Sequence, residues 1–537
     1  MTRRGALLAS AALLAIYLVL SLGNDTRGFL GTDTGGKVAT LRAMDAHHDF
    51  DPDIGYWAAK WDPNGALHPL YYTSHIGDRW VNVTTLPALL AAEPLYRALG
   101  YRGALLLPML GAVACALAAA ALARRLGARD GGRLAFWLVG LASPVAIYAL
   151  DFWEHTLGLA AMAWATIVLV DVVQRRRPAW FGVVAGVLFG VAATMRTEAL
   201  AFGAVATAIA CLAVVRTRVT AAVVMGACVA AGLAVPLLAN QALEHAVLGS
   251  SLRSTRAEQT VSDAGSSDSA GRVKEAAITT VGVTSAGDTP SLVFGAAIAA
   301  AVALAALRRD ARLAFLAAAL LLARTAAGLD FVPGFLAAAP IGAVGIALGW
   351  RRGPPAPLLL SIALVSLPLV WAVQFTGGAG PQWGGRYVLL SSLLVMVVGV
   401  VALAEAPVAV ARAVIGVSVL VTALGLAWMF QRTHDIAESA RRLDAEPAPV
   451  LVSRVAHLVR EGGAVHDLDR WLTAPSEADL RRVARVVDGA GVDRVALVDI
   501  DGRHEPARIG QLRRQRGSHS LRFLPGTRLR VWTYSRE

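Results

Sequence analysis

The chain has 537 residues, of which 56% are hydrophobic and 16% are charged, and its mean hydropathy is +0.55. This apolar excess is too large for the cores of a water-soluble protein of this length, so the composition excludes that class. The formal net charge is +12, but the arginines lie mainly at the ends of apolar segments and near the C-terminus. Membrane orientation explains most of this charge, and we expect no nucleic-acid partner.

Long apolar segments recur along the chain, and each has about 17 to 23 residues, the length of a helix that crosses the hydrocarbon core. If Arg3 and Arg4 lie in the cytoplasm, the basic clusters between the later segments fall on the same side, as the positive-inside rule requires. We therefore expect about thirteen transmembrane helices in the cell membrane. The predicted spans are Gly5–Leu22, Gly103–Ala123, Leu134–Leu150, Thr156–Val173, Phe181–Met195, Ala199–Val215, Thr220–Asn240, Leu292–Leu307, Leu313–Ala327, Phe335–Trp350, Leu358–Phe375, Tyr387–Ala404 and Val408–Phe430.

This topology divides the chain into a transmembrane domain at 1–430 and an extracytoplasmic soluble domain at 431–537. Two further outside segments are the first loop, 23–102, and a polar loop, 244–291, of which Ser250–Asp288 is expected to be mobile. Within the first loop, Val81–Leu99 is expected to be a helix at the membrane interface because prolines and charges interrupt it.

The C-terminal tail differs from the spans because its apolar residues alternate or repeat at helical spacing. We expect helices at Pro449–Leu458 and Ala478–Val487, and strands at Val495–Ile500, Leu521–Phe523 and Leu529–Trp532. The predicted fold class is an all-α polytopic membrane protein with a small C-terminal α/β domain.

The first outside loop opens with the motif Gly31-Thr32-Asp33-Thr34-Gly35-Gly36-Lys37, directly after the first span. A carboxylate at Asp33 is held near the membrane surface, and the glycines allow a ligand to approach the backbone closely. Lys37 follows Asp33 by one helical turn and can meet a phosphate. The alternative is that Asp33 only caps a helix that begins near Gly36.

The same loop is rich in aromatic, acidic and imidazole side chains, among them Trp57, Trp61 and Tyr71. Carbohydrate sites combine these types, because aromatic faces stack on sugar rings while polar groups bond the hydroxyls. Tryptophan and tyrosine also collect at membrane interfaces without any ligand, so both interpretations stay open. The histidines show no spacing typical of a zinc site.

Two short polar segments lie at the predicted outer ends of spans. Asp151-Phe152-Trp153-Glu154-His155 places two carboxylates and an imidazole on one helical face, and Arg196-Thr197-Glu198 lies at the same level. Ionisable residues at membrane depth are costly, so they indicate either a functional site or pairing with one another. For Arg196 and Glu198 the alternative is an interhelical ion pair.

A third outer segment, Gly380-Pro381-Gln382-Trp383-Gly384-Gly385-Arg386-Tyr387, leads into the twelfth predicted span. The guanidinium of Arg386, with flexible backbone around it, suits the phosphate of a lipid. Alternatively, Arg386 extends to the lipid headgroups.

Over residues 1–430 this layout resembles the C-type (GT-C) membrane glycosyltransferases, most nearly the protein O-mannosyltransferase and aminoarabinose transferase branch. The resemblance includes the acidic first loop with Asp33, the interfacial helix, the cytoplasmic Ala123–Gly127 sequence and the second acidic site. The most specific element is the Pro381–Tyr387 turn.

The resemblance implies transfer of a sugar from a polyprenyl-phosphate donor, with inversion, to a glycan, lipid or protein acceptor outside the cytoplasm. Asp33 would be the general base, and Arg386 would hold the donor phosphate, with Lys37 and Arg196 as further phosphate candidates. The candidates for a secondary acidic site are Asp151, Glu154, His155 and Glu198, and those for sugar stacking are Trp57, Trp61, Tyr71 and Trp383.

No cofactor is required by the sequence, and the one candidate is a divalent cation, Mg²⁺ or Mn²⁺, at Asp151, Glu154 and His155. Many members of this branch have an Asp-Glu pair in the first loop, whereas here Thr34 follows Asp33. The class of acceptor and the need for a metal are therefore not carried over from the resemblance.

Two other classes of function stay open. A transporter or flippase of lipid-linked or envelope substrates would show internal repeats with broken helices at matching positions, and we find no convincing repeat. A polymerase or ligase of lipid-linked glycans also uses outside arginines, but it has no need for Asp33 so close to the first span.

Overall fold

The computed structural model describes residues 2–82, 85–128, 131–252, 269–283, 289–373, 382–463, 466–502, 506–524 and 527–536. The chain divides into two compact units. We call Met1–Leu20, Leu105–Ala242 and Arg256–Trp428 the helical unit. Ser21–Ala104, Leu243–Thr255 and Met429–Glu537 form the sheet unit, which thus contains the first outside loop together with the tail.

Within the described residues, nine helices are long and apolar enough to cross a bilayer. They are α1 (Arg3–Ser21), Tyr101–Arg125 with α4 (Tyr101–Ala104) and α5 (Leu106–Arg125), α8 (His155–Val173), α10 (Glu198–Val215), α11 (Val219–Leu248), α14 (Thr289–Arg308), α18 (Ala356–Val373), Arg386–Leu403 with η4 (Arg386–Val388) and α19 (Leu389–Leu403), and α20 (Val408–Asp444). The chain is a multi-pass membrane protein.

Four predicted spans are occupied by shorter helices. These are α6 (Gly131–Leu141) with α7 (Pro144–Tyr148), η1 (Ala179–Phe181) with α9 (Gly182–Met195), α15 (Ala311–Thr325), and α16 (Phe335–Ala338) with α17 (Ile341–Leu348) and η2 (Gly349–Arg351). Every segment predicted to span the membrane thus contains a helix. Together with the mixed sheet of the tail, described below, these helices confirm the predicted fold class.

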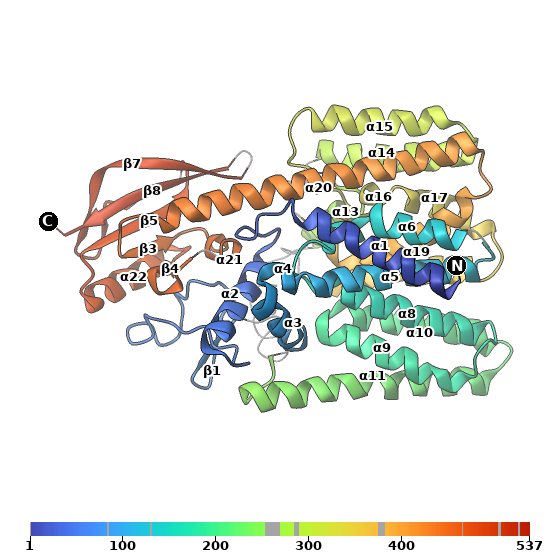
Figure 1. Ribbon diagram of the computed structural model, residues 1–537, viewed down its shortest axis with the longest axis horizontal. Helices are drawn as coiled ribbons and strands as arrows, with labels where there is room; N and C mark the ends of the chain where they lie inside the picture. The colour runs from blue at the N-terminus through green and yellow to red at the C-terminus, as the bar shows by residue number, and fades with distance from the viewer. Residues whose placement is uncertain are drawn as a thin grey trace. The chain divides into compact units, whose positions relative to one another are not determined.

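The helices of the helical unit pack through small residues, which let their backbones approach closely. In a bilayer the hydrophobic effect does not drive helices together, so this close packing stabilises their association. Helices α17 and α19 cross at two glycines, because a Cβ on Gly345 would overlap the Val395 carbonyl and one on Gly399 would overlap the Ile341 carbonyl. Helices α5, α6 and α8 also lie side by side, and α9 packs on α8 (Figure 1).

The Ala123–Gly127 sequence ends α5 with an ion pair to the neighbouring helix. Arg125 donates from Nε and Nη2 to the two carboxylate oxygens of Asp171 at 2.7 and 2.6 Å, joining α5 to the end of α8. This fork geometry is specific to arginine and gives the motif a structural role.

The predicted polar loop 244–291 is partly helical. Helix α11 continues to Leu248, and residues 269–281 form α13 (Ser269–Val281). Residues 253–268 and 284–288 of the segment predicted to be mobile lie outside the described residues.

The sheet unit begins with α2 (Thr32–His47), the hairpin of β1 (Ser74–Ile76) and β2 (Arg79–Val81), and α3 (Leu86–Leu99). Its tail contains β3 (Val450–Ser453), α21 (Leu458–Glu461), η5 (Leu468–Arg470), β4 (Trp471–Thr473), α22 (Glu477–Ala490), β5 (Arg494–Ile500), β6 (Arg508–Ile509), β7 (Leu512–Leu524) and β8 (Thr527–Ser535). The six strands are ordered β4-β3-β5-β8-β7-β6 (Figure 1), and β3 is parallel to β4 and β5 while the other pairs are antiparallel.

Both faces of this sheet are buried. Along β5, Val495 and Leu497 face the core under α22, whereas Ala496 and Val498 face a second core that includes Ile436 of α20. Alternation with period two therefore produces an apolar strand with no polar face. The first loop supplies side chains to both cores, and these are Ala58 and Leu67 on one face and Ala39 and Leu70 on the other.

The structure confirms the predicted helix at Ala478–Val487 and the three predicted strands, as α22, β5, β7 and β8. The predicted helix at Pro449–Leu458 is wrong, because Val450–Ser453 form the buried strand β3. A short apolar run buried on both faces cannot be told from a buried helix by periodicity alone.

Two buried histidines make the sheet unit sensitive to acid. Burial lowers the pKa of His68 to about 4, and burial together with the positive charge of Arg42 lowers the pKa of His466 to about 3. In the unfolded chain both groups titrate near pH 6.5. As the pH falls below about 6.5, the unfolded state binds protons that the folded state does not, so stability decreases.

We predict that the unfolding temperature of the full chain falls between pH 6.5 and pH 4, and that His466→Phe reduces this fall. Phenylalanine retains the packing on Trp471, whose ring centroid lies 4.6 Å from that of His466, and it removes a slope of up to about 1.4 kcal/mol per pH unit. Tryptophan fluorescence during heating measures this effect, with the exposed His434→Phe as a matched control. Equal pH dependence in wild type and His466→Phe would contradict the assignment.

Candidate functional site

Asp33 lies in the first turn of α2, which starts at Thr32 with Gly31 as its N-cap. Asp33 is therefore not the cap residue, and the alternative that it only caps a helix starting near Gly36 is wrong. Its carboxylate accepts from Arg460 Nη2 at 3.4 Å, and 25% of its side chain is exposed while Arg460 is 2% exposed. The positive end of the helix dipole also favours a carboxylate at this position. The result is an oriented carboxylate that solvent and ligands can still reach.

The two glycines of the motif explain how Arg460 reaches this position. A Cβ on Gly35 would overlap the Arg460 carbonyl, and one on Gly36 would overlap Asn82 Oδ1 and lie 3.1 Å from Arg460 Nε. The sequence indicated a close approach by a ligand, whereas the structure fills this space with α21 of the tail. Lys37, the predicted phosphate candidate on the same helix, is buried.

The turn that contains Tyr71 and Tyr72 is linked to Asp33 through Arg460. Asn82 Nδ2 donates to the Tyr71 carbonyl at 3.0 Å and to Thr73 Oγ1 at 2.8 Å, which fixes the turn. The Tyr72 ring centroid lies 5.7 Å from the Arg460 guanidinium. His457 contacts the Tyr71 ring edge to face, and burial and the charge of Arg460 lower the pKa of His457 against an opposing effect of Asp33.

A second cluster lies in the helical unit, where three segments far apart in sequence meet. Arg196 Nε donates to Glu198 Oε1 at 2.9 Å, and Arg196 Nη1 lies 3.5 Å from Glu154 Oε1. Glu154 and Glu198 are buried and the Arg196 side chain is 10% exposed, so the interhelical ion pair that the sequence left open does form. Asp151 is also buried here, and the His155 ring stacks on Tyr148 with centroids 5.0 Å apart.

Arg386 and Arg196 lie against the same aromatic ring. Arg386 Nη2 donates to the Tyr387 hydroxyl at 2.8 Å. The guanidinium carbon of Arg386 lies 4.7 Å from the Tyr387 ring centroid, and that of Arg196 lies 5.4 Å from it. Both arginines are half-buried, and Arg196 in addition faces two carboxylates.

The backbone before Arg386 requires its glycines. Gly384 and Gly385 have φ of 69° and 66°, and a Cβ on Gly384 would overlap Pro144 while one on Gly385 would lie 2.6 Å from Thr279. The preceding carbonyl, of Trp383, accepts from the Tyr148 hydroxyl at 2.9 Å. The turn thus joins α7 to the start of α19 and holds Arg386 beside Tyr387.

The four predicted sugar-stacking residues lie in different surroundings. Trp57 donates its indole N–H to the Trp471 carbonyl at 3.1 Å, and Trp61 packs against Gly489, so both help to join the first loop to the tail. Trp383 is 1% exposed and packs against Phe331 and Trp428. Among the four, Tyr71 is the one that lies beside Asp33's neighbours His457 and Tyr72.

The predicted cation residues do not fit a metal ion. In the described part of the chain, no group of three or more His, Cys, Asp or Glu side chains is arranged to hold one. Glu154 instead faces the guanidinium of Arg196, and His155 is packed between the rings of Tyr148 and Trp153. We derive no catalytic step through a metal.

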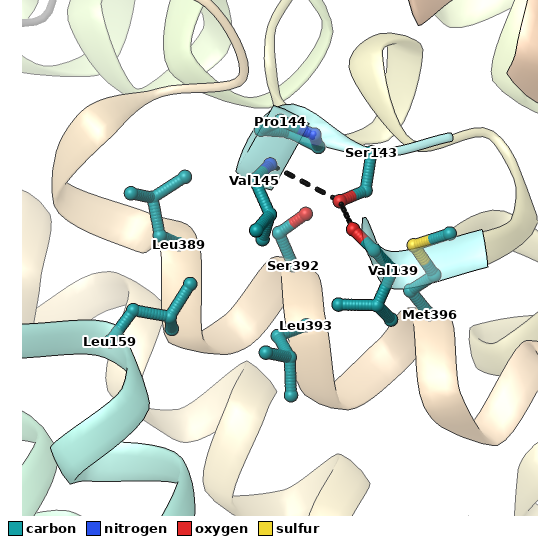
Figure 2. Close-up of a pocket in the computed structure, with 9 residues that line it drawn as sticks. All are labelled: Val139, Ser143, Pro144, Val145, Leu159, Leu389, Ser392, Leu393 and Met396. Carbon is teal, nitrogen blue, oxygen red and sulfur yellow. Dashed lines mark hydrogen bonds between the residues drawn. The ribbon is translucent and has the colours of Figure 1, made fainter. Parts of the chain in front are cut away.

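A small pocket in the helical unit is too apolar for a sugar phosphate. It lies among α6, α7, α8 and α19, and Figure 2 shows that Ser143 donates to the Val139 carbonyl and accepts from the Val145 N–H, so its hydroxyl is already bonded. The pocket is lined by Val139, Ser143, Pro144, Val145, Leu159, Leu389, Ser392, Leu393 and Met396. We place no polar ligand here.

Sequence reasoning missed two residues around Asp33, namely His457 and Arg460. Arg460 is 427 residues away from Asp33 along the chain, and nothing in its local sequence marks it. The Gly35-Gly36 pair was the one available signal, because adjacent glycines in a helix indicate that another segment comes close.

No protein-family model matches the sequence, and no curated protein matches it. The fold is similar to solved structures of C-type membrane glycosyltransferases. One is ArnT from Cupriavidus metallidurans bound to undecaprenyl phosphate, with a TM-score of 0.49, 12% identity and 97% of each chain covered.

A second similar structure is the oligosaccharyltransferase of Archaeoglobus fulgidus in its apo form, with a TM-score of 0.46, 12% identity, and 91% of this chain and 69% of that chain covered. The same archaeal enzyme in complex with an inhibitory peptide and a dolichol-phosphate gives a TM-score of 0.45 and 13% identity, with the same coverage. These similarities concern the fold alone.

Proposed function

We propose that this protein is a membrane glycosyltransferase that moves a sugar from a polyprenyl-phosphate donor to an acceptor on the extracytoplasmic face, with inversion at the anomeric carbon. The observation that carries the proposal is the partly exposed Asp33 carboxylate held by the buried Arg460. A transporter or flippase has no need for a carboxylate oriented in this way outside the spans.

In the proposed reaction, an acceptor hydroxyl attacks the anomeric carbon of the donor sugar. The bond between that carbon and the phosphate oxygen breaks as the new glycosidic bond forms, and the hydroxyl proton passes to the Asp33 carboxylate. The polyprenyl phosphate leaves with the electron pair of the broken bond. Arg460 supports this step by keeping the carboxylate in one orientation, which is a positioning role.

The donor phosphate requires a cation in the site. Arg386 follows the glycine pair Gly384-Gly385 at the start of α19, where its guanidinium packs on the Tyr387 ring and donates to the Tyr387 hydroxyl, whereas Arg196 faces two carboxylates. We assign the phosphate to Arg386, whose charge would stabilise the leaving group as negative charge develops on it. In the topology that the positive-inside rule predicts, both Asp33 and the C-terminal domain would lie outside the cytoplasm.

Asp33→Asn should lower turnover by about 100-fold or more, because the amide retains the shape but takes no proton. Purified full-length protein is incubated with polyprenyl-phosphate mannose, arabinose or glucose, and the released polyprenyl phosphate is measured. Asp78→Asn, at an exposed carboxylate of the same loop, is the control and should retain activity. Undiminished turnover by Asp33→Asn would remove the assignment of the base.

Arg386→Ala should raise the KM for the donor, because the phosphate loses its cation in the ground state as well as in the transition state. Arg386→Lys should have an intermediate effect, since an ammonium keeps the charge but not the planar fork. Arg324→Ala, which removes an arginine paired with Asp330 elsewhere in the helical unit, is the matched control. A normal donor KM in Arg386→Ala would count against the phosphate role.

A further inference from the structure

Three rings lie together near Arg460, the ion-pair partner of Asp33, and we call Tyr71, Tyr72 and His457 the aromatic shelf. The ring centroids of Tyr71 and Tyr72 are 4.2 Å apart, and His457 lies 5.2 Å from Tyr71 and 6.5 Å from Tyr72. Both tyrosines are half-buried, and His457 exposes part of its surface to solvent although the surrounding protein still desolvates its imidazole. The shelf therefore presents ring surface to solvent within a folded unit.

The shelf is held in a costly conformation. Tyr72 has a φ of 68°, in the left-handed region that a bulky residue rarely adopts. The buried Asn82 keeps the turn in place through its bonds to the Leu70 and Tyr71 carbonyls. Strain of this kind persists where surrounding contacts maintain it, and it is concentrated at functional sites.

Polar groups border the shelf on the side of Asp33. The Arg460 guanidinium lies 5.7 Å from the Tyr72 ring centroid and 3.4 Å from the Asp33 carboxylate. Desolvation and the positive charge of Arg460 lower the pKa of the His457 imidazole, against an opposing effect of Asp33, and so favour its neutral form. A neutral imidazole offers one donor and one acceptor.

We infer that the acceptor is a carbohydrate, and that one of its sugar rings lies on the aromatic shelf with a hydroxyl directed toward Asp33. This inference rests on the proposed function, since it names the acceptor of the same reaction. It also gives the C-terminal domain a role, because His457 and Arg460 belong to that domain.

A sugar ring matches the shelf better than the other acceptor classes. Its C–H faces pack on aromatic rings, and its hydroxyls bond carboxylate, guanidinium and imidazole groups, so it uses both kinds of surface at once. An acyl chain would cover the partly exposed Asp33 carboxylate without offering it a hydrogen-bond donor. A serine or threonine side chain is too small to cover three rings.

The test measures binding without donor, so that it is independent of turnover. Full-length protein in a detergent without sugar headgroups is titrated with mannotriose, arabinotriose, maltotriose and chitotriose, and binding is followed by saturation-transfer NMR. At least one trisaccharide should bind. Tyr71→Leu and Tyr72→Leu should each raise its Kd by about three- to tenfold, as expected for the loss of a stacked ring.

Two further variants separate stacking from folding. Tyr71→Phe retains the ring and should bind almost as wild type, and Tyr96→Leu, at a half-buried tyrosine of α3 in the same unit, should leave the Kd unchanged. His457→Gln should weaken binding while leaving the unfolding temperature near that of wild type. If Tyr71→Leu and Tyr72→Leu bind as tightly as wild type, the shelf is not the sugar site and the inference fails.

The outcomes also separate this inference from the proposed function. Donor turnover with a hydroxylated peptide or a lipid, together with no binding of any trisaccharide, would overturn the inference and leave the glycosyltransferase proposal intact. Binding of a trisaccharide at the shelf, together with no turnover of any donor, would contradict the proposed function instead.

Discussion

The contact on which the candidate site depends is that between Arg460 and the start of α2. A guanidinium that is only 2% exposed must be neutralised within the protein, because leaving a buried charge without a partner costs several kcal/mol. Asp33 supplies this neutralisation, and Gly35 and Gly36 provide the space that lets α21 lie against α2. The same contact therefore fixes the C-terminal domain on the first loop and fixes the carboxylate.

The two charged clusters obey the same constraint in different ways. In the helical unit, Arg196 forms ion pairs with two carboxylates, and these ion pairs have a structural role. Arg386 donates to the Tyr387 hydroxyl and packs on the Tyr387 ring. In the sheet unit, Asp33 pairs with Arg460 while 25% of its side chain stays exposed. The charged groups of the two clusters thus differ in their partners and in how much of each side chain is exposed.

The fold was predictable where the bilayer dictates the pattern. A helix that crosses hydrocarbon needs a long apolar run, so each predicted span contains a helix, and the charged residues at the ends mark where the spans turn. The secondary structure of the tail was harder to predict. Val450–Ser453 is buried on both faces, and such a short apolar run shows no periodicity that separates a strand from a helix. Its helix α22, by contrast, was predictable because one face is polar.

The candidate site was predictable only in its local parts. Asp33, Glu154 and Arg386 were identified because each lies in a short motif at the end of a span. Arg460 and His457 were not, because their importance comes from contacts with residues several hundred positions away, which one sequence does not encode in any local pattern. Trp57 and Trp61 show the opposite case, in which a residue type typical of sugar sites packs within the protein.

The central claim is that Arg460 acts through Asp33, and a double-mutant cycle on turnover tests it most directly. Single-turnover release of polyprenyl phosphate is measured for Arg460→Met, Asp33→Asn and the double variant. We predict that Arg460→Met slows release by about 10- to 100-fold in the wild-type background, where a misplaced base costs rate, and by no further factor in the Asp33→Asn background. An equal slowing in both backgrounds would contradict the account.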